Sequence, residues 1–112
     1  VPQTIAGDGD PVDVLVMTPF PLPPGVVVPC RAIGILLMED EGGMDGKVLA
    51  VPTEKILASY AKIKTLDDIH ELQLKQIAHF FEKGKWVKVY GWEGVESAAK
   101  EIMDGIANYN KA

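Results

Sequence analysis

The chain has 112 residues, 47% of them hydrophobic and 24% charged, and a formal net charge of −5 at pH 7. This length predicts a single domain over residues 1–112. The acidic balance argues against nucleic acid or an anionic membrane as the main partner. Cys30 is the only cysteine, so no intrachain disulfide can form, which is typical of the reducing cytoplasm. No apolar run approaches the roughly 18 residues of a membrane span. We therefore expect a cytoplasmic protein that does not act at a membrane.

The most informative stretch is residues 7–16, which read Gly-Asp-Gly-Asp-Pro-Val-Asp-Val-Leu-Val. It places three carboxylates directly before an apolar, β-branched run that predicts a buried strand. With an extended backbone, Asp8 and Asp10 would point to the same face. Pro11 would then turn the chain and re-aim Asp13. Carboxylate oxygens on a rigid edge favour a hard-cation site, because two uncompensated carboxylates about 4 Å apart repel by roughly 4 kcal/mol at an effective dielectric constant near 20.

The alternative to a cation site is an ordinary acidic turn whose Asp side chains cap backbone amides. An EF-hand is excluded because, counting from Asp8, the sixth position is Asp13 rather than Gly and the twelfth is Pro19 rather than Glu. A second acidic turn carries Asp40 and Asp45 on either side of two glycines. Alone it is typical of a solvated turn, but beside the first cluster it could complete a site for several metal ions.

The first two thirds of the chain predict short strands separated by turns. Residues 18–25 contain four prolines and indicate a stiff surface connection. Residues 26–28 predict the start of a strand that the following proline restricts to an edge or interrupts. Residues 31–38 predict the next strand, the Gly-rich acidic turn 39–46 follows, and residues 47–51 return as its hairpin partner.

The remainder predicts two helices around a last strand. Thr65 and Asp68 have capping-box spacing ahead of a helix. Its apolar stripe consists of Leu74, Ile77, Ala78 and Phe81. Residues 86–92 alternate large and polar side chains and predict a strand. A C-terminal helix is indicated by the spacing of Val95, Ala98, Ala99, Ile102, Ile106 and Tyr109. Short strands and two helices without a βαβ rhythm favour a small β-barrel with helices packed outside.

Other chemistry is less well supported. A phosphate-binding P-loop is rejected because Gly42 and Gly46 have only three residues between them and Val48 follows the lysine. Basic and aromatic residues alternate over 83–92 as in single-strand-binding barrels, but the chain as a whole is acidic. Neither histidine has a cysteine or second histidine at zinc-ligand spacing, and His79 on a helix is by default a packed or interfacial residue.

The motif Asp-Gly-Asp-Pro-Val-Asp-Val at 8–14 resembles the signature of the family I soluble inorganic pyrophosphatases. The stretches 38–47, 51–52, 77–82 and 83–89 also resemble bacterial members in order and spacing. The similarity covers nearly the whole chain.

This resemblance implies an α+β, mainly β fold: a small five-stranded, OB-like β-barrel with two main helices packed outside. It implies Mg²⁺-dependent hydrolysis of inorganic pyrophosphate to two orthophosphates, with several Mg²⁺ ions bound and Mn²⁺ as a substitute. It further implies a homo-oligomer, a hexamer, with His79 near a subunit contact. Finally, it implies that the chain is the C-terminal two-thirds of the enzyme, without its N-terminal strands. A short stretch with a phosphate-contacting Tyr-Lys pair would lie between Glu82 and Lys83 in relatives.

The resemblance also implies roles for five aspartates and one lysine. The metal ligands would be Asp8, Asp13, Asp40 and Asp45. Asp13 would bridge two ions, Asp10 would be the general base for the attacking water, and Lys47 would contact a phosphate. The alternative is a non-catalytic OB-like barrel that binds a cation or phosphate. Retention of Asp10 distinguishes the two, because binding alone requires no base there.

Overall fold

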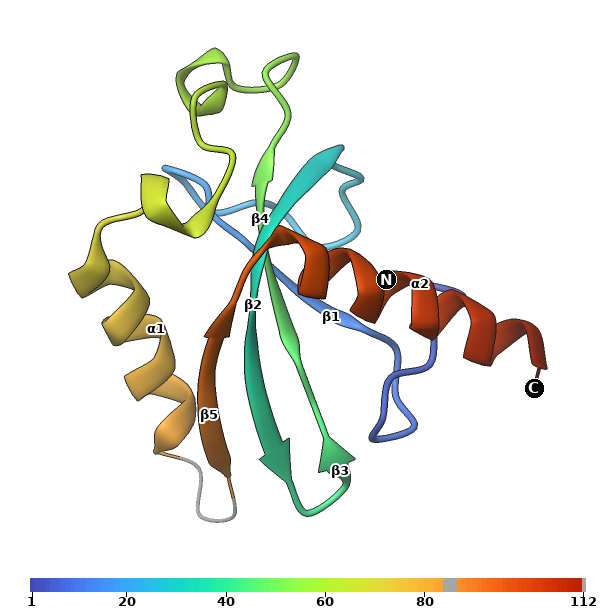
Figure 1. Cartoon of the computed structure of the whole chain (residues 1–112). Helices are drawn as coiled ribbons and strands as arrows, with labels where there is room; N and C mark the ends of the chain where they lie inside the picture. The colour runs from blue at the N-terminus through green and yellow to red at the C-terminus, as the bar shows by residue number, and fades with distance from the viewer. Residues whose placement is uncertain (84–86, 112) are drawn as a thin grey trace.

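A computed structural model describes residues 1–83 and 87–111 and shows a five-stranded sheet with two α-helices (Figure 1). The strands are β1 (Asp13–Val16), β2 (Cys30–Asp40), β3 (Gly43–Met44), β4 (Lys47–Pro52) and β5 (Lys88–Glu93). The helices are α1 (Glu71–Glu82) and α2 (Val95–Lys111), and the 3-10 turns η1 (Ala58–Tyr60) and η2 (Leu66–Asp68) lie between β4 and α1. In the described part of the chain, neither helix has the length and apolar character needed to cross a bilayer.

The long strand β2 is the centre of the sheet. It pairs antiparallel with β3, β4 and β5, and β1 is added parallel to β4 with Asp13 opposite Lys47. Two register shifts, at Ala32/Gly34 and at Leu37/Met38, bend this strand. The sheet therefore curls into a half-barrel, which confirms the predicted α+β, mainly β, OB-like fold with two helices outside.

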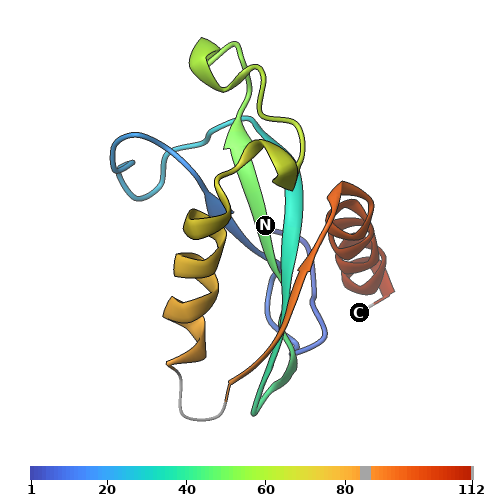
Figure 2. The ribbon, with the colours of Figure 1, turned by 60° about the vertical axis from the view of Figure 1, so that its left-hand side comes forward.

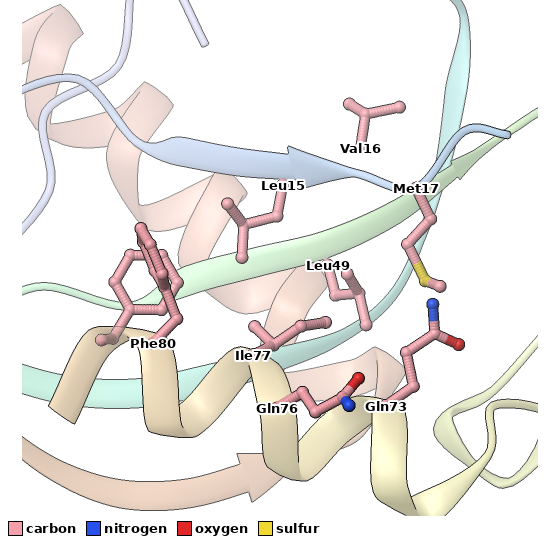
Figure 3. A pocket seen from close by; sticks show the side chains of 9 residues that line it. Leu15, Val16, Met17, Leu49, Gln73, Gln76, Ile77 and Phe80 are labelled. Carbon is pink, nitrogen blue, oxygen red and sulfur yellow. The ribbon is translucent and has the colours of Figure 1, made fainter. Parts of the chain in front are cut away.

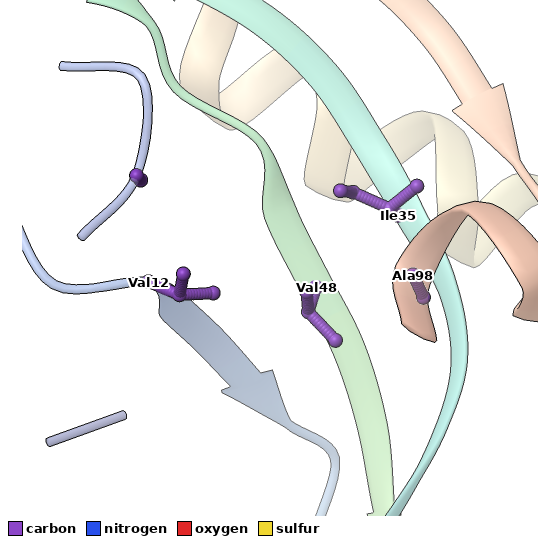
Figure 4. Close-up of a cluster of buried hydrophobic side chains, with 5 residues drawn as sticks. Val12, Ile35, Val48 and Ala98 are labelled. Carbon is purple, nitrogen blue, oxygen red and sulfur yellow. The ribbon is translucent and has the colours of Figure 1, made fainter. Parts of the chain in front are cut away.

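The two helices cover opposite faces of the sheet (Figure 2). On the α2 face, the buried cluster consists of Ala6, Val12, Ile35, Val48 and Ala98 (Figure 4). On the α1 face, the buried residues are Ile33, Leu49, Val51 and Ile69, packed against others that include Leu74 and Ile77 of α1. Because side chains alternate along a strand, Val48 and Leu49 contribute to different faces although they are neighbours in sequence.

The C-terminal helix forms as predicted, but only part of its apolar stripe is buried. Ala98 is fully buried, whereas Ile106 and Tyr109 remain 38% and 44% exposed. The helix packs closely at Gly105, where an added Cβ would lie 2.7 Å from Cγ2 of Val12, the residue before β1. The absence of a side chain at this position, and not only the apolar spacing, therefore sets how α2 lies on the sheet.

Two local predictions had different outcomes. The capping box is confirmed, and the carboxylate of Asp68 accepts a hydrogen bond from the backbone N–H of Thr65 at 3.1 Å. It caps η2, however, and α1 begins only after His70, whose Nδ1 accepts from the N–H of Leu72 at 3.1 Å. The strand expected at 26–28 is wrong: these residues lie outside the sheet, because the next residue is a proline without an N–H to donate.

The connection from α1 to β5 is described only in part. Lys83 follows the helix as its C-cap residue, and residues 84–86 lie outside the described part of the chain. The predicted strand start at Trp86 therefore falls outside the described residues, while β5 itself begins at Lys88. The additional stretch expected between Glu82 and Lys83 in relatives stays a prediction.

Candidate metal centre

Three carboxylates from separate segments converge at one end of the sheet. Asp8 comes from the turn before β1, Asp40 ends β2, and Asp45 lies just before β4. One carboxylate oxygen of each lies within 4.8 Å of one of each of the others. Oxygen donors from three segments at this spacing fit a hard divalent cation such as Mg²⁺, whose ligands in proteins are oxygens.

The turn that carries Asp8 differs from the extended backbone expected there. Gly9 has a φ of +87°, in the left-handed region that favours glycine. The N–H of Gly9 donates to the carbonyl of Ala6 at 3.0 Å, and the N–H of Asp10 donates to Oδ1 of Asp8 at 3.0 Å. Asp8 therefore caps its own turn as well as facing the other carboxylates, while Asp10 is exposed in the same turn.

Two glycines let the second acidic turn approach the first. Gly43 has a φ of +118°, and a Cβ on it would lie 3.3 Å from the carbonyl oxygen of Gly7. Gly42 donates its N–H to Oδ1 of Asp40 at 2.8 Å, which fixes that carboxylate. A side chain at position 43 would strain the backbone and separate the two turns. The sequence showed these glycines, but only the structure shows what they approach.

Lys47 connects the cluster to β1. The parallel pairing of β1 with β4 places Asp13 opposite Lys47. The Nζ atom of Lys47 lies 2.5 Å from Oδ2 of Asp13 and 2.8 Å from Oδ2 of Asp45. The ammonium therefore stands between these two carboxylates. The five residues to which the family resemblance assigns metal and phosphate binding thus lie in one region, and their roles stay a prediction.

Burial and like charges raise the energy of the ionised cluster. Asp45 is only 6% exposed, and this burial raises its pKa, as do the nearby charges of Asp8 and Asp13, while Lys47 acts in the opposite direction. Burial lowers the pKa of Lys47, but its hydrogen bonds to Asp13 and Asp45 outweigh this, and the pKa is raised overall. A cation bound beside Asp45 is favoured, because its positive charge offsets the repulsion between Asp45 and the carboxylates of Asp8 and Asp13.

Glu101 is a neighbour of this cluster that the sequence did not indicate. It lies on α2, and its carboxyl carbon would be 3.7 Å from a Cβ placed on Gly46. Burial raises the pKa of Glu101, and the charges of Asp104, Asp45 and Asp8 add to this effect. Helical spacing showed only the apolar stripe of α2, so no local signal separated Glu101 from the solvated charges of the same helix.

An apolar groove continues from the charged residues along the α1 face. It has a volume of about 420 Å³ and lies between β1, β4 and α1. Leu15 and Leu49 face Ile77 and Phe80 across it (Figure 3). Leu15 follows Asp13 by two residues and Leu49 follows Lys47 by two, so strand alternation places charge and groove on the same face.

His79, expected to be packed or interfacial, is exposed on the outer side of α1.

Comparison with known proteins shows which family the chain belongs to. The family model described as inorganic pyrophosphatase matches residues 1–110. The chain is 57% identical to an inorganic pyrophosphatase of Ralstonia nicotianae and 50% identical to one of Rickettsia bellii, in each case over 99% of this chain and 67% of the relative. Among solved structures, an inorganic pyrophosphatase from Coxiella burnetii is similar with a TM-score of 0.93 and 51% identity, over 97% of this chain and 68% of that one.

A sheet half-barrel with an acidic centre, together with matches over nearly the whole of this chain, defines an enzyme class, the hydrolases of phosphoric anhydrides. The chain belongs to the inorganic pyrophosphatase family. It spans about two thirds of the length of the relatives it matches.

Proposed function

We propose that this protein hydrolyses inorganic pyrophosphate to two orthophosphates with the help of Mg²⁺. The observation that carries the proposal is the convergence of Asp8, Asp40 and Asp45, with oxygens within 4.8 Å of one another, beside the ammonium of Lys47. A site of this charge repels free pyrophosphate, so the substrate anion requires cations to bind there. Family membership supplies the substrate class.

Within this proposal, each residue has a separate task. Bound divalent cations supply positive charge to the anionic substrate and make a water molecule more acidic. The three converging carboxylates would hold the cations together with Asp13, which lies across Lys47 from Asp45. Asp10 is exposed in the turn beside Asp8, where its carboxylate can accept a proton from the attacking water. Lys47 donates hydrogen bonds from its ammonium to a phosphate oxygen.

We further propose that residues 1–112 act as one cytoplasmic domain that assembles into a homo-oligomer, a hexamer. Equilibrium sedimentation of the purified protein measures the mass of the assembly directly. A monomer at all concentrations would contradict the oligomer without affecting the proposed chemistry.

The function is tested by measuring phosphate release from pyrophosphate with Mg²⁺, with Mn²⁺, and with a chelator. We expect release with Mg²⁺, slower release with Mn²⁺, and none with the chelator. The matched control is the response to an organic phosphate monoester, which should not be hydrolysed. If calorimetry showed Mg²⁺ binding but pyrophosphate remained intact, the protein would be the non-catalytic cation-binding barrel instead.

A further inference from the structure

One aromatic residue of α1 reaches the charged end of the sheet. The ring centroid of Phe81 lies 5.9 Å from the Nζ atom of Lys47. Phe80, its neighbour, packs edge-on against the Phe81 ring with centroids 5.2 Å apart, but is itself 70% exposed. Phe81 is therefore the point at which the helix, rather than the strands, touches the proposed substrate-binding group.

The Lys47 ammonium has carboxylates on one side and an aromatic ring on the other. Asp13 and Asp45 attract its ammonium from the strand side, at 2.5 and 2.8 Å. The Phe81 ring lies on the side of α1 and of the apolar groove. An ammonium within about 6 Å of a ring centroid is attracted by the negative face of the ring, and this attraction is stronger away from water. Lys47 has only 13% of its side chain exposed, so the ring contact is largely shielded from solvent.

The Phe81 ring gives the flexible Lys47 side chain a further contact that holds its ammonium in place. A lysine side chain has four rotatable carbon bonds and loses conformational entropy when it is held in one place. When a cation competes for Asp13 and Asp45, and a substrate phosphate competes with them for Lys47, the two carboxylate contacts that fix the ammonium are weakened. The ring contact is unaffected by that competition, because Mg²⁺ takes oxygen ligands and an aromatic ring offers none.

We propose that Phe81 is a positioning residue, whose ring holds the Lys47 ammonium at the site while substrate is bound. This inference rests on the proposed function, since it assigns Lys47 a substrate phosphate. It differs from a purely structural role in one respect. Filling space at position 81 requires only an apolar side chain, whereas holding an ammonium requires an aromatic face.

The direct test of the contact is the NMR signal of the Lys47 ε-methylene group, assigned with the K47R variant. Protons above an aromatic ring are shifted upfield, so we expect Phe81→Leu to move this signal downfield and Phe81→Tyr to leave it in place. Phe80→Leu is the matched control, because it removes a neighbouring ring that does not face Lys47. An unchanged signal in Phe81→Leu would overturn the proposal whether or not the protein is active.

The functional test is the kinetics of pyrophosphate hydrolysis in Mg²⁺. We expect Phe81→Leu to raise KM by about three- to tenfold with little change in kcat, the effect of losing binding energy shared by substrate and transition state. Phe81→Tyr should restore the wild-type KM. If Phe81→Leu does not fold, Phe81→Met serves in its place, since methionine adapts to irregular spaces. Equal KM values for the leucine and tyrosine variants would overturn the proposal. An inactive wild-type protein would overturn the proposed function itself.

Discussion

The two faces of the sheet use the same strands for different purposes. On the α2 face, Val12 and Val48 are fully buried in an apolar cluster. On the α1 face, the very next residue of one strand and the preceding residue of the other, Asp13 and Lys47, form an ion pair at 2.5 Å. A step of one residue along a strand thus separates a packed core from charged chemistry, because side chains alternate between the faces.

The difference between the two faces indicates which residues stabilise the fold and which are available for function. The buried clusters on both faces exclude water and stabilise the sheet, so the charged end of the α1 face, with Asp13, Asp45 and Lys47, can hold groups that repel one another. Asp45 is the clearest case, since burial and neighbouring carboxylates raise its pKa and so disfavour its ionised form, although Lys47 acts in the opposite direction. Substitutions at this charged end should therefore change activity, and substitutions in the buried cluster of the α2 face should change stability.

The largest expected effect is the loss of turnover in Asp10→Asn. We expect pyrophosphate hydrolysis to fall by about 10²- to 10⁴-fold, because the substitution removes the proposed general base. The free energy of unfolding should change by no more than about 0.5 kcal/mol, since Asp10 is exposed. Calorimetry of Mg²⁺ binding is the control. Asp10→Asn should keep its cation affinity and Asp13→Asn should lose it, and equal losses would contradict a separate base role.

The converse experiment is Ile35→Ala on the apolar face. Ile35 is 1% exposed, so the substitution should cost about 2–5 kcal/mol of unfolding free energy, measured by urea titration. The milder Ile35→Val should cost about 0.5–1.5 kcal/mol. Both variants should bind Mg²⁺ and hydrolyse pyrophosphate close to the wild-type rate when folded. A loss of cation affinity that matches the loss of stability would show that the two faces are not separable.

A divalent cation should stabilise the protein only through the charged face. At one hundred times its dissociation constant, Mg²⁺ should add about 2.7 kcal/mol to the unfolding free energy. Asp8→Asn should remove most of this gain, because Asp8 is one of the three converging carboxylates. Asp104→Asn is the matched control, as Asp104 instead pairs with Lys100 at 2.7 Å. The same gain in both variants would place the cation elsewhere.

The smallest expected effect concerns Glu101, which lies on α2 yet is affected by the charges of the other face. Its raised pKa means that its contribution to stability is fully present below the ordinary glutamate pKa and is lost as the pH rises through the raised value. Glu101→Gln should remove that loss and be more stable at neutral pH, by no more than about 1 kcal/mol because the group is partly exposed.

The measurement for this variant is the unfolding free energy between pH 4 and pH 8 without divalent cations. Glu54 and Asp68 have lowered pKa values and act with the opposite sign, so only the difference between Glu101→Gln and wild type isolates Glu101. A difference that is constant with pH would mean that burial and the neighbouring carboxylates do not raise the pKa of Glu101 in the folded protein.

The sequence by itself determined the strands that carry the site and the residue types at it. Apolar β-branched runs predicted β1, β2 and β4, because a buried strand is recognised from the apolar pattern of its own residues. The clustered aspartates and their glycines were equally local, and they carried the family resemblance. The strand predicted at 26–28 failed for a local reason as well, since Pro29 cannot donate to a neighbouring strand.

The tertiary structure alone decided which of these residues meet. The parallel pairing of β1 with β4 sets Asp13 opposite Lys47, although 34 residues separate them in sequence. The contact of Phe81 with Lys47 and the approach of Glu101 to Gly46 depend on how α1 and α2 lie on the curled sheet. No local pattern encodes these contacts, because the position of each helix is set by packing over the whole sheet, as the close approach at Gly105 shows.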